Sequence, residues 1–202
     1  MKEIQLPINQ TISVTFTSED LASNDAVDMG NGVSRVSLGT MIDAEISDNL
    51  QTARKNGGTI LYATTSIEQQ IENILLKYFM GDFIQYEERR EIFEKEILQS
   101  SALSYSAKKE LLLKIVNNLK LLQRKKKEKL QKCLKDIMVW RNAFAHGNVR
   151  NDTKKGCFIK YYSGCEKEFI LTDSFWLKIE NGFNDGSTLL KDVADKLNNK
   201  SA

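Results

Sequence analysis

Proline and histidine are almost missing from this chain of 202 residues, which holds one proline, Pro7, and one histidine, His146. Because proline is the strongest helix breaker, its scarcity permits long helices through most of the sequence. The three cysteines, Cys133, Cys157 and Cys165, lack the spacing of metal ligands, and a single histidine adds little to them. We therefore expect no zinc site, no other metal and no cofactor.

Long apolar runs are also lacking. No uninterrupted apolar span approaches the roughly 20 residues that a membrane helix needs, and the chain starts Met-Lys-Glu-Ile-Gln without an apolar signal core. We expect no membrane partner and a cytoplasmic location, since a reducing compartment suits an odd number of cysteines. Hydrophobic residues still make up 41% of the chain, enough for one substantial domain with an appendage or two small domains.

Positive charge is concentrated in one stretch. Between residues 108 and 135, only Glu110 and Glu128 oppose a run of lysines with one arginine. A polyanionic partner such as RNA is the functional interpretation, and a solvated helix face is the alternative. The candidate nucleic-acid contacts, which include two lysines further along the chain, are Lys125, Lys126, Lys127, Lys129, Lys154 and Lys155.

Local signals in the first half of the chain predict helices separated by stops. We expect a helix over about 37–54, ended by Asn56-Gly57-Gly58. Thr65-Ser66-Ile67-Glu68 has the pattern of a capping box, which predicts a new helix start, and the apolar stripe after it ends at Gly81. A further helix is expected over 86–98. Residues 1–35 are expected to be loosely structured, with a strand at 12–16.

The second half is expected to be helical up to residue 146. No glycine or proline occurs in 106–146, and one helix of that length would measure about 60 Å, too long to bury a single stripe in a small domain. We therefore expect a turn within 123–127 and a left-handed stop at Gly147. A β-hairpin over 157–171 follows, and then a helical region from Thr172 that Asn184-Asp-Gly-Ser187 interrupts.

Together these elements predict a mainly α protein. We expect an antiparallel bundle of four or five helices with a small C-terminal β-hairpin and a loosely structured N-terminal segment. Residues 1–60 are expected to form an N-terminal extension, residues 61–150 the helical bundle, and residues 151–202 the hairpin with C-terminal helices packed on the bundle.

The run Arg141-Asn142-Ala143-Phe144-Ala145-His146-Gly147 offers the most specific chemistry. RNA is cut by its own 2′-hydroxyl when a base takes the hydroxyl proton, an acid protonates the leaving 5′-oxygen and a cation stabilises the phosphorane. Imidazole serves as base or acid near neutral pH, and arginine presents a permanently charged fork to phosphate oxygens. The alternative is a histidine that merely caps its helix, favoured by the helix dipole.

The spacing of the two groups limits how they can meet. Positions i and i+5 of a helix lie about 140° apart, so Arg141 and His146 share a pocket only if the last turn unwinds toward Gly147 or a second subunit contributes. A symmetric dimer would also supply a second imidazole, so that acid and base come from two chains. Asn142 could set the tautomer of His146 or contact the phosphate.

The pattern Arg-Asn-x-x-Ala-His-Gly at the end of an amphipathic helix resembles the motif of the HEPN superfamily (higher eukaryote and prokaryote nucleotide-binding domains), which are small helical bundles. The resemblance covers roughly residues 65–149, and the run 103–109 is similar to uncharacterised members. It implies a metal-independent endoribonuclease, often a toxin or a phage-defence effector. It also implies a homodimer in which Arg141 and His146 of both chains share a cleft, with Asn142 as the polar position of the motif.

Two other functions remain open. Some members of the superfamily are not known as nucleases, so the chain could be a non-catalytic HEPN dimer that binds RNA, a nucleotide or a regulatory protein such as an antitoxin. A purely structural helical protein with a coincidental motif is the third interpretation.

Overall fold

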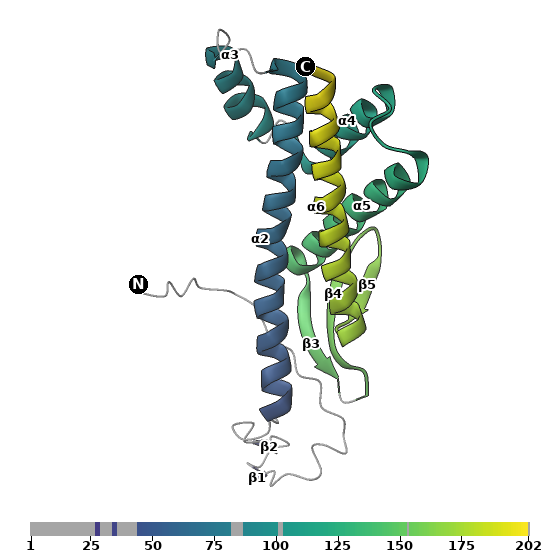
Figure 1. The fold of residues 1–202 in the computed structure, drawn as a ribbon. Coiled ribbons are helices and arrows are strands. Elements are labelled where there is room, and N and C mark those ends of the chain that lie inside the picture. Colours follow the sequence, from purple (N-terminus) through teal and green to yellow (C-terminus); the bar gives the residue numbers. More distant parts are fainter. Residues whose placement is uncertain are drawn as a thin grey trace. The chain divides into compact units, whose positions relative to one another are not determined.

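The computed structural model describes residues 27–28, 34–35, 44–81, 87–100, 103–152 and 154–201. In these ranges the protein is mainly helical with a small antiparallel sheet (Figure 1). The expected strand at 12–16 lies outside the described residues. The elements in chain order are β1 (Val27–Asp28), β2 (Ser34–Arg35), α2 (Ala44–Met80), α3 (Glu87–Ile92), the π-helix η2 (Phe93–Leu98), α4 (Tyr105–Asn118), α5 (Arg124–His146), β3 (Asn148–Asp152), β4 (Gly156–Tyr162), β5 (Glu166–Ile170) and α6 (Asp173–Ser201).

The chain forms two compact units. Among the described residues, the first comprises those within Met1–Gly58 and Ala143–Asp173, and the second comprises those within Thr59–Asn142 and Ser174–Ala202. The first unit contains the three-stranded sheet, and the second contains most of the helices. None of the described helices combines the length and the apolar character that crossing a membrane requires.

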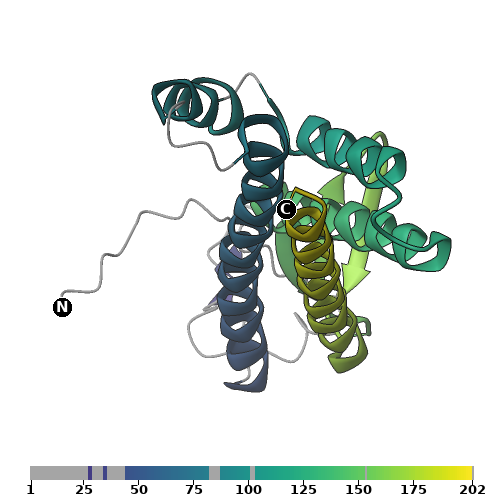
Figure 2. The same cartoon turned by 45° about the horizontal axis from the view of Figure 1, so that its top comes forward.

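In the second unit, α2 and α6 run side by side, and α4 and α5 form a helical hairpin (Figure 2). Aliphatic side chains from all four helices form its core, with Leu75, Leu112, Leu134 and Leu190 at most 1% exposed. Burial of such side chains stabilises the fold by about 1.5–3 kcal/mol each. The apolar stripe predicted after residue 65 faces the core as far as Leu75, with Ile71 at 0% exposure. Its last two members, Tyr78 and Phe79, are instead 39% and 47% exposed.

Helix α2 runs through the stop predicted at residues 56–58. That prediction is wrong because Gly57 serves helix packing and does not end the helix. A Cβ atom on Gly57 would lie 2.9 Å from Cδ1 of Phe144, whereas one on Gly58 would meet nothing within 4 Å. The stop predicted at Gly81 is correct: its φ is 63°, and its N–H donates to the carbonyl oxygen of Lys77 at 2.9 Å.

The helix start predicted at Thr65 is also wrong, because this residue lies inside α2. The hydroxyls of Thr64 and Thr65 donate to the carbonyl oxygens of Ile60 and Leu61, one turn earlier, at 2.8 and 3.2 Å. Threonine makes this contact within a helix and not at its N-terminus. Glu68 is also not a capping residue, since its carboxylate binds Lys108 of α4.

The two helices expected over 106–146 are present as α4 and α5, but the turn between them occupies 119–123 and not 123–127. Lys120 has a φ of 51°, and the N–H of Leu121 donates to the carbonyl oxygen of Val116 at 3.0 Å. Adjacent like charges suggested a break at 123–127. Residues 124–127 are helical instead, and Lys126 is held by Asp192 of α6 at 2.9 Å.

Helix α6 continues through residues 184–187, so the predicted interruption is wrong. Its glycines lie where α6 meets α5. A Cβ on Gly182 would lie 2.6 Å from Cη2 of Trp140, and one on Gly186 would lie 3.3 Å from Cδ1 of Ile137. Glycine removes side-chain bulk at this contact and lets the two helices approach closely.

Besides the short β1-β2 pair, the first unit has a three-stranded antiparallel sheet of order β3-β4-β5, one strand more than the expected hairpin. Val149 pairs with Ile159, and Ile159 pairs with Phe169, which places all three on one face. Ile159 is fully buried. Helix α5 does end before Gly147, but the φ of Gly147 is not positive, so the predicted left-handed conformation is wrong. A Cβ on Gly147 would lie 2.9 Å from the carbonyl oxygen of Lys160, so only glycine fits between α5 and β3.

The two adjacent glycines of α2 give a matched test of this packing. We expect Gly57→Ala to lower the free energy of unfolding by about 1–3 kcal/mol, because the new methyl group overpacks against Phe144. Gly58→Ala should raise it by about 0.5–1 kcal/mol, because alanine favours the helix and meets no neighbour. Denaturant unfolding of both variants measures the difference, and equal effects would contradict the close contact.

Candidate functional site

The three motif residues, Arg141, Asn142 and His146, are exposed near the C-terminal end of α5. Nη1 of Arg141 donates a hydrogen bond to Oδ1 of Asn142 at 3.0 Å. The helix remains regular through His146, so the last turn does not unwind toward Gly147. The structure thus brings Arg141 and Asn142 together in the second unit, whereas His146 belongs to the first unit.

Arg141 and Asn142 line a groove of the second unit with a volume of about 470 Å³. We call it the Arg141 groove. Helix α2, the start of α4 and helix α5 all contribute to it. Its lining consists of Thr64, Glu68, Gln99, Ser100, residues 103–106, Lys108, Met138, Arg141 and Asn142. Residues 103–106 and Lys108, which belong to the run 103–109 singled out in the sequence, therefore border the same groove as Arg141 and Asn142.

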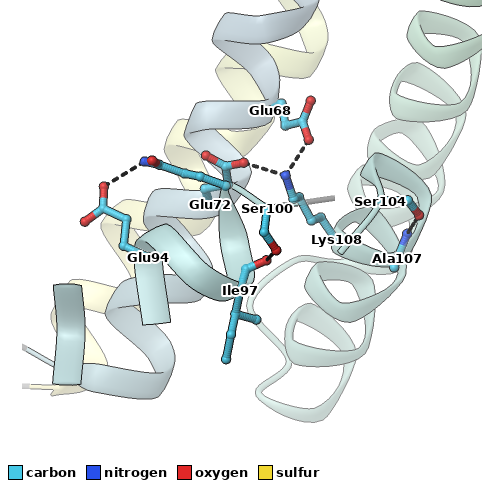
Figure 3. Close-up of polar contacts among 9 residues, drawn as sticks. Glu68, Glu72, Glu94, Ile97, Ser100, Ser104, Ala107 and Lys108 are labelled. Carbon is cyan, nitrogen blue, oxygen red and sulfur yellow. Dashed lines mark hydrogen bonds and ion pairs between the residues drawn. The ribbon is translucent and has the colours of Figure 1, made fainter. Parts of the chain in front are cut away.

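Lys108 is a buried cation in the wall of this groove, with 3% exposure. Its Nζ lies 2.5 Å from Oε1 of Glu68 and 2.5 Å from Oε1 of Glu72. Figure 3 shows the ammonium in contact with both carboxylates. Burial alone would lower the pKa of Lys108, but hydrogen bonds and charge from the two carboxylates outweigh it and raise the pKa. Lys108 is therefore an ammonium at neutral pH and ties α4 to α2.

The first residues of α4 are held by local hydrogen bonds. Oγ of Ser104 accepts the N–H of Ala107 at 3.3 Å and caps the helix (Figure 3). The hydroxyl of Tyr105 donates to the carbonyl oxygen of Leu134 in α5 at 3.3 Å. Burial, followed by the nearby charge of Glu68, raises the pKa of Tyr105. Tyr105 thus keeps its proton and joins α4 to α5, which makes it unsuited to act as a base.

Several of the lysines predicted to contact nucleic acid are matched by polar partners. Lys126 pairs with Asp192, and Nζ of Lys129 lies 2.8 Å from Oδ1 of Asp185. Nζ of Lys127 donates a hydrogen bond to Oδ1 of Asn117 at 2.9 Å. Lys125 is exposed. The acids Asp185 and Asp192 lie on α6, far along the sequence, so charge counting over 108–135 missed them. Their ion pairs weaken the positive field of α5.

Lys154 and Lys155 lie in the turn between β3 and β4, in the first unit. Their backbone N–H groups donate to Oδ1 of Asp152 at 2.8 and 3.0 Å, and these hydrogen bonds lower the pKa of Asp152. Nζ of Lys155 also lies 2.8 Å from Glu168 and 5.7 Å from the centre of the Phe158 ring. Lys154 is exposed, so of the two it is the freer to meet an anion.

Comparisons with known protein families, with curated proteins and with solved structures found no match for this chain. Within the described ranges, no three or more histidine, cysteine, aspartate or glutamate side chains are arranged to hold a metal ion. The candidate site therefore consists of the exposed guanidinium of Arg141 and amide of Asn142, which line the groove. The exposed imidazole of His146 lies at the end of the same helix.

We expect the free energy of unfolding to fall as the pH rises above about 10, where model lysine and tyrosine side chains titrate. The pKa values of Lys108 and Tyr105 are raised in the folded protein, so it keeps protons that the unfolded chain releases. The stability that these two protons contribute is complete at a pH below the pKa values of the two groups in the unfolded chain. It is lost as the pH rises through their higher pKa values in the folded protein.

Denaturant unfolding from about pH 8 to 11.5, a range that brackets both reference pKa values, measures this dependence. Tyr105→Phe should make the alkaline decline less steep. Tyr162→Phe is the control, because Tyr162 is 79% exposed, and it should leave the slope unchanged. A stability that is constant over the range would show that neither proton is held more tightly in the folded state.

Proposed function

We propose that the chain is a HEPN-type, metal-independent endoribonuclease that acts as a homodimer. The observation that supports this proposal is the joint exposure of Arg141, Asn142 and His146 near the end of one helix, where a polyanion can reach them. A side chain with only a packing role would be buried, as Phe144 of the same helix is at 7% exposure.

The proposed reaction needs no group beyond these side chains. Arg141 binds the non-bridging oxygens of the phosphodiester and stabilises the charge of the phosphorane. His146 accepts the proton of the 2′-hydroxyl while its oxygen attacks phosphorus. His146 of the partner subunit protonates the 5′-oxygen as the P–O5′ bond breaks. The products are a 2′,3′-cyclic phosphate and a 5′-hydroxyl, and atoms and protons balance between the two imidazoles.

The requirement for a dimer follows from this chain's composition and helix geometry. It holds one histidine, yet the reaction needs a base and an acid at the same time. The helix is regular through His146, so Arg141 and His146 of one chain point in directions about 140° apart. A two-fold axis next to α5 would let each cleft combine groups from both chains. The roles as toxin or phage-defence effector, and an antitoxin as partner, follow from the resemblance alone.

One observation favours the alternative, a non-catalytic HEPN dimer that binds RNA, a nucleotide or a regulatory protein. Lys126 and Lys129 are already paired with Asp192 and Asp185. An RNA strand must compete with these carboxylates for the lysines, which reduces the electrostatic gain of binding. A groove that holds a ligand beside Arg141 without cleaving it is consistent with this function.

Cleavage of a single-stranded RNA in the presence of EDTA tests the catalytic proposal. We expect products with 2′,3′-cyclic phosphate ends, and we expect His146→Ala to reduce the rate by about 10²–10⁴-fold, the usual contribution of positioned proton transfer. Gln131→Ala is the control, because Gln131 is exposed on the same helix outside the motif. Mass spectrometry identifies the product ends, and circular dichroism checks that both variants fold.

Undiminished cleavage by folded His146→Ala would refute the assigned role. RNA binding without product at high protein concentration would favour the non-catalytic alternative. Size-exclusion chromatography with light scattering gives the mass, and a monomer at the concentrations where RNA is cut would exclude the shared cleft.

Two aspartates of α6 offer a matched test of the lysines as RNA contacts. Asp192→Asn releases Lys126 and Lys196, whereas Asp195→Asn removes the same charge from an exposed position outside these pairs. We expect Asp192→Asn to bind RNA more tightly than Asp195→Asn does, with a salt dependence steeper by about 0.7 for each added phosphate contact. Fluorescence anisotropy at several salt concentrations measures both, and identical behaviour would exclude Lys126 as a contact.

A further inference from the structure

The Arg141 groove presents a cation from α5 and a carboxylate from α2 to the same cavity. Among the described residues, the Arg141 guanidinium makes one hydrogen bond, from Nη1 to Asn142. An arginine side chain carries five N–H donors. The remaining donors of this exposed side chain are open to a bound group, and their fork fits the oxygens of a phosphate.

Glu68 contributes an acceptor to the groove. Its Oε1 receives the ammonium of Lys108 at 2.5 Å, and the side chain remains 29% exposed. A carboxylate has about four lone-pair sites, so a single ammonium leaves most of its accepting capacity unused. Lys108 is moreover shared with Glu72, so one cation faces two carboxylates (Figure 3). A ligand that fills this side of the groove must therefore donate hydrogen bonds.

The space between these groups suits a flat, partly apolar ring. Leu103 and Met138 line the groove as half-buried apolar side chains, and they can pack against a ring face. The volume of about 470 Å³ falls within the range of sites that take small organic ligands. An anionic group for Arg141, a planar ring and an edge of donors together describe a nucleotide.

We propose that the Arg141 groove binds a guanosine nucleotide, with its phosphate on Arg141 and Asn142 and its base edge on Glu68. Guanine carries two adjacent donors, N1–H and the N2 amino group, which match a carboxylate. Adenine and cytosine place a ring acceptor beside their amino group, and uracil flanks its N3–H with two carbonyl oxygens, so a carboxylate repels part of each edge. The inference rests on the proposed function, because RNA is the source of the nucleotide.

Isothermal titration calorimetry of the full chain with the guanosine, adenosine, cytidine and uridine 5′-monophosphates and with inorganic phosphate tests the proposal. We expect the guanosine nucleotide to bind at least about tenfold more tightly than each of the other three nucleotides, which is the usual discrimination of a paired base edge. Inorganic phosphate should bind more weakly than any nucleotide. Arg141→Gln should weaken all four nucleotides alike, because the phosphate is common to them.

The two glutamates that share Lys108 give a matched pair of variants. Glu68→Gln and Glu72→Gln each weaken one contact to Lys108, but only Glu68 lines the groove. We expect Glu68→Gln to lose the preference for guanosine by about tenfold and Glu72→Gln to retain it. An equal loss in both would show that the preference depends on packing around Lys108 and would overturn the role of Glu68.

The proposal is also overturned if the guanosine nucleotide does not bind, if all four nucleotides bind equally, or if inorganic phosphate binds as tightly as they do. Its failure is distinguishable from that of the proposed ribonuclease. Nucleotide binding needs neither His146 nor turnover, so selective binding without RNA cleavage leaves the groove assigned and refutes the enzyme. If the protein cleaves RNA but its groove shows no preference among the nucleotides, the ribonuclease proposal stands and the guanosine proposal is refuted.

Discussion

The ammonium of Lys108 joins α4 to α2 from a position that is almost closed to solvent. Removing a charge from water costs several kcal/mol, and only close partners of opposite charge can compensate. Glu68 and Glu72 provide these partners from successive turns of α2. The contact sets the start of α4 against α2, while Tyr105 ties the same start to α5. The groove beside Arg141 depends on both connections.

Close helix packing explains why the second unit can combine a polar groove with a dense core. Helix α6 approaches α5 through glycine, where the ring of Trp140 lies almost against the backbone of Gly182. The same approach brings Asp185 and Asp192 next to lysines of α5. The lysine-rich helix is therefore partly neutralised within its own chain, so any polyanion that binds there must offer more than general charge attraction.

The sequence correctly predicted features that depend on near neighbours along the chain, such as the end of α2 at Gly81 and the burial of the stripe around Ile71. It wrongly predicted a stop at Gly57. A glycine inside a helix costs about 1 kcal/mol in local preference, and close packing against Phe144 outweighs that cost. Strand β3 was missed because its Asn-Val-Arg-Asn-Asp sequence disfavours strands, and pairing with β4 decides its conformation.

By itself the sequence determined the mainly helical character, because apolar residues recur at helix spacing. It also determined that Arg141, Asn142 and His146 lie near a helix end, because the helix that carries them stops before Gly147. The groove was decided only by the tertiary structure, since it combines Glu68, Lys108 and Arg141 from three helices. The pairing of Lys126 with an aspartate 66 positions away was decided in the same way. Local preferences act over a few residues, whereas charges and cavities depend on which distant segments pack together.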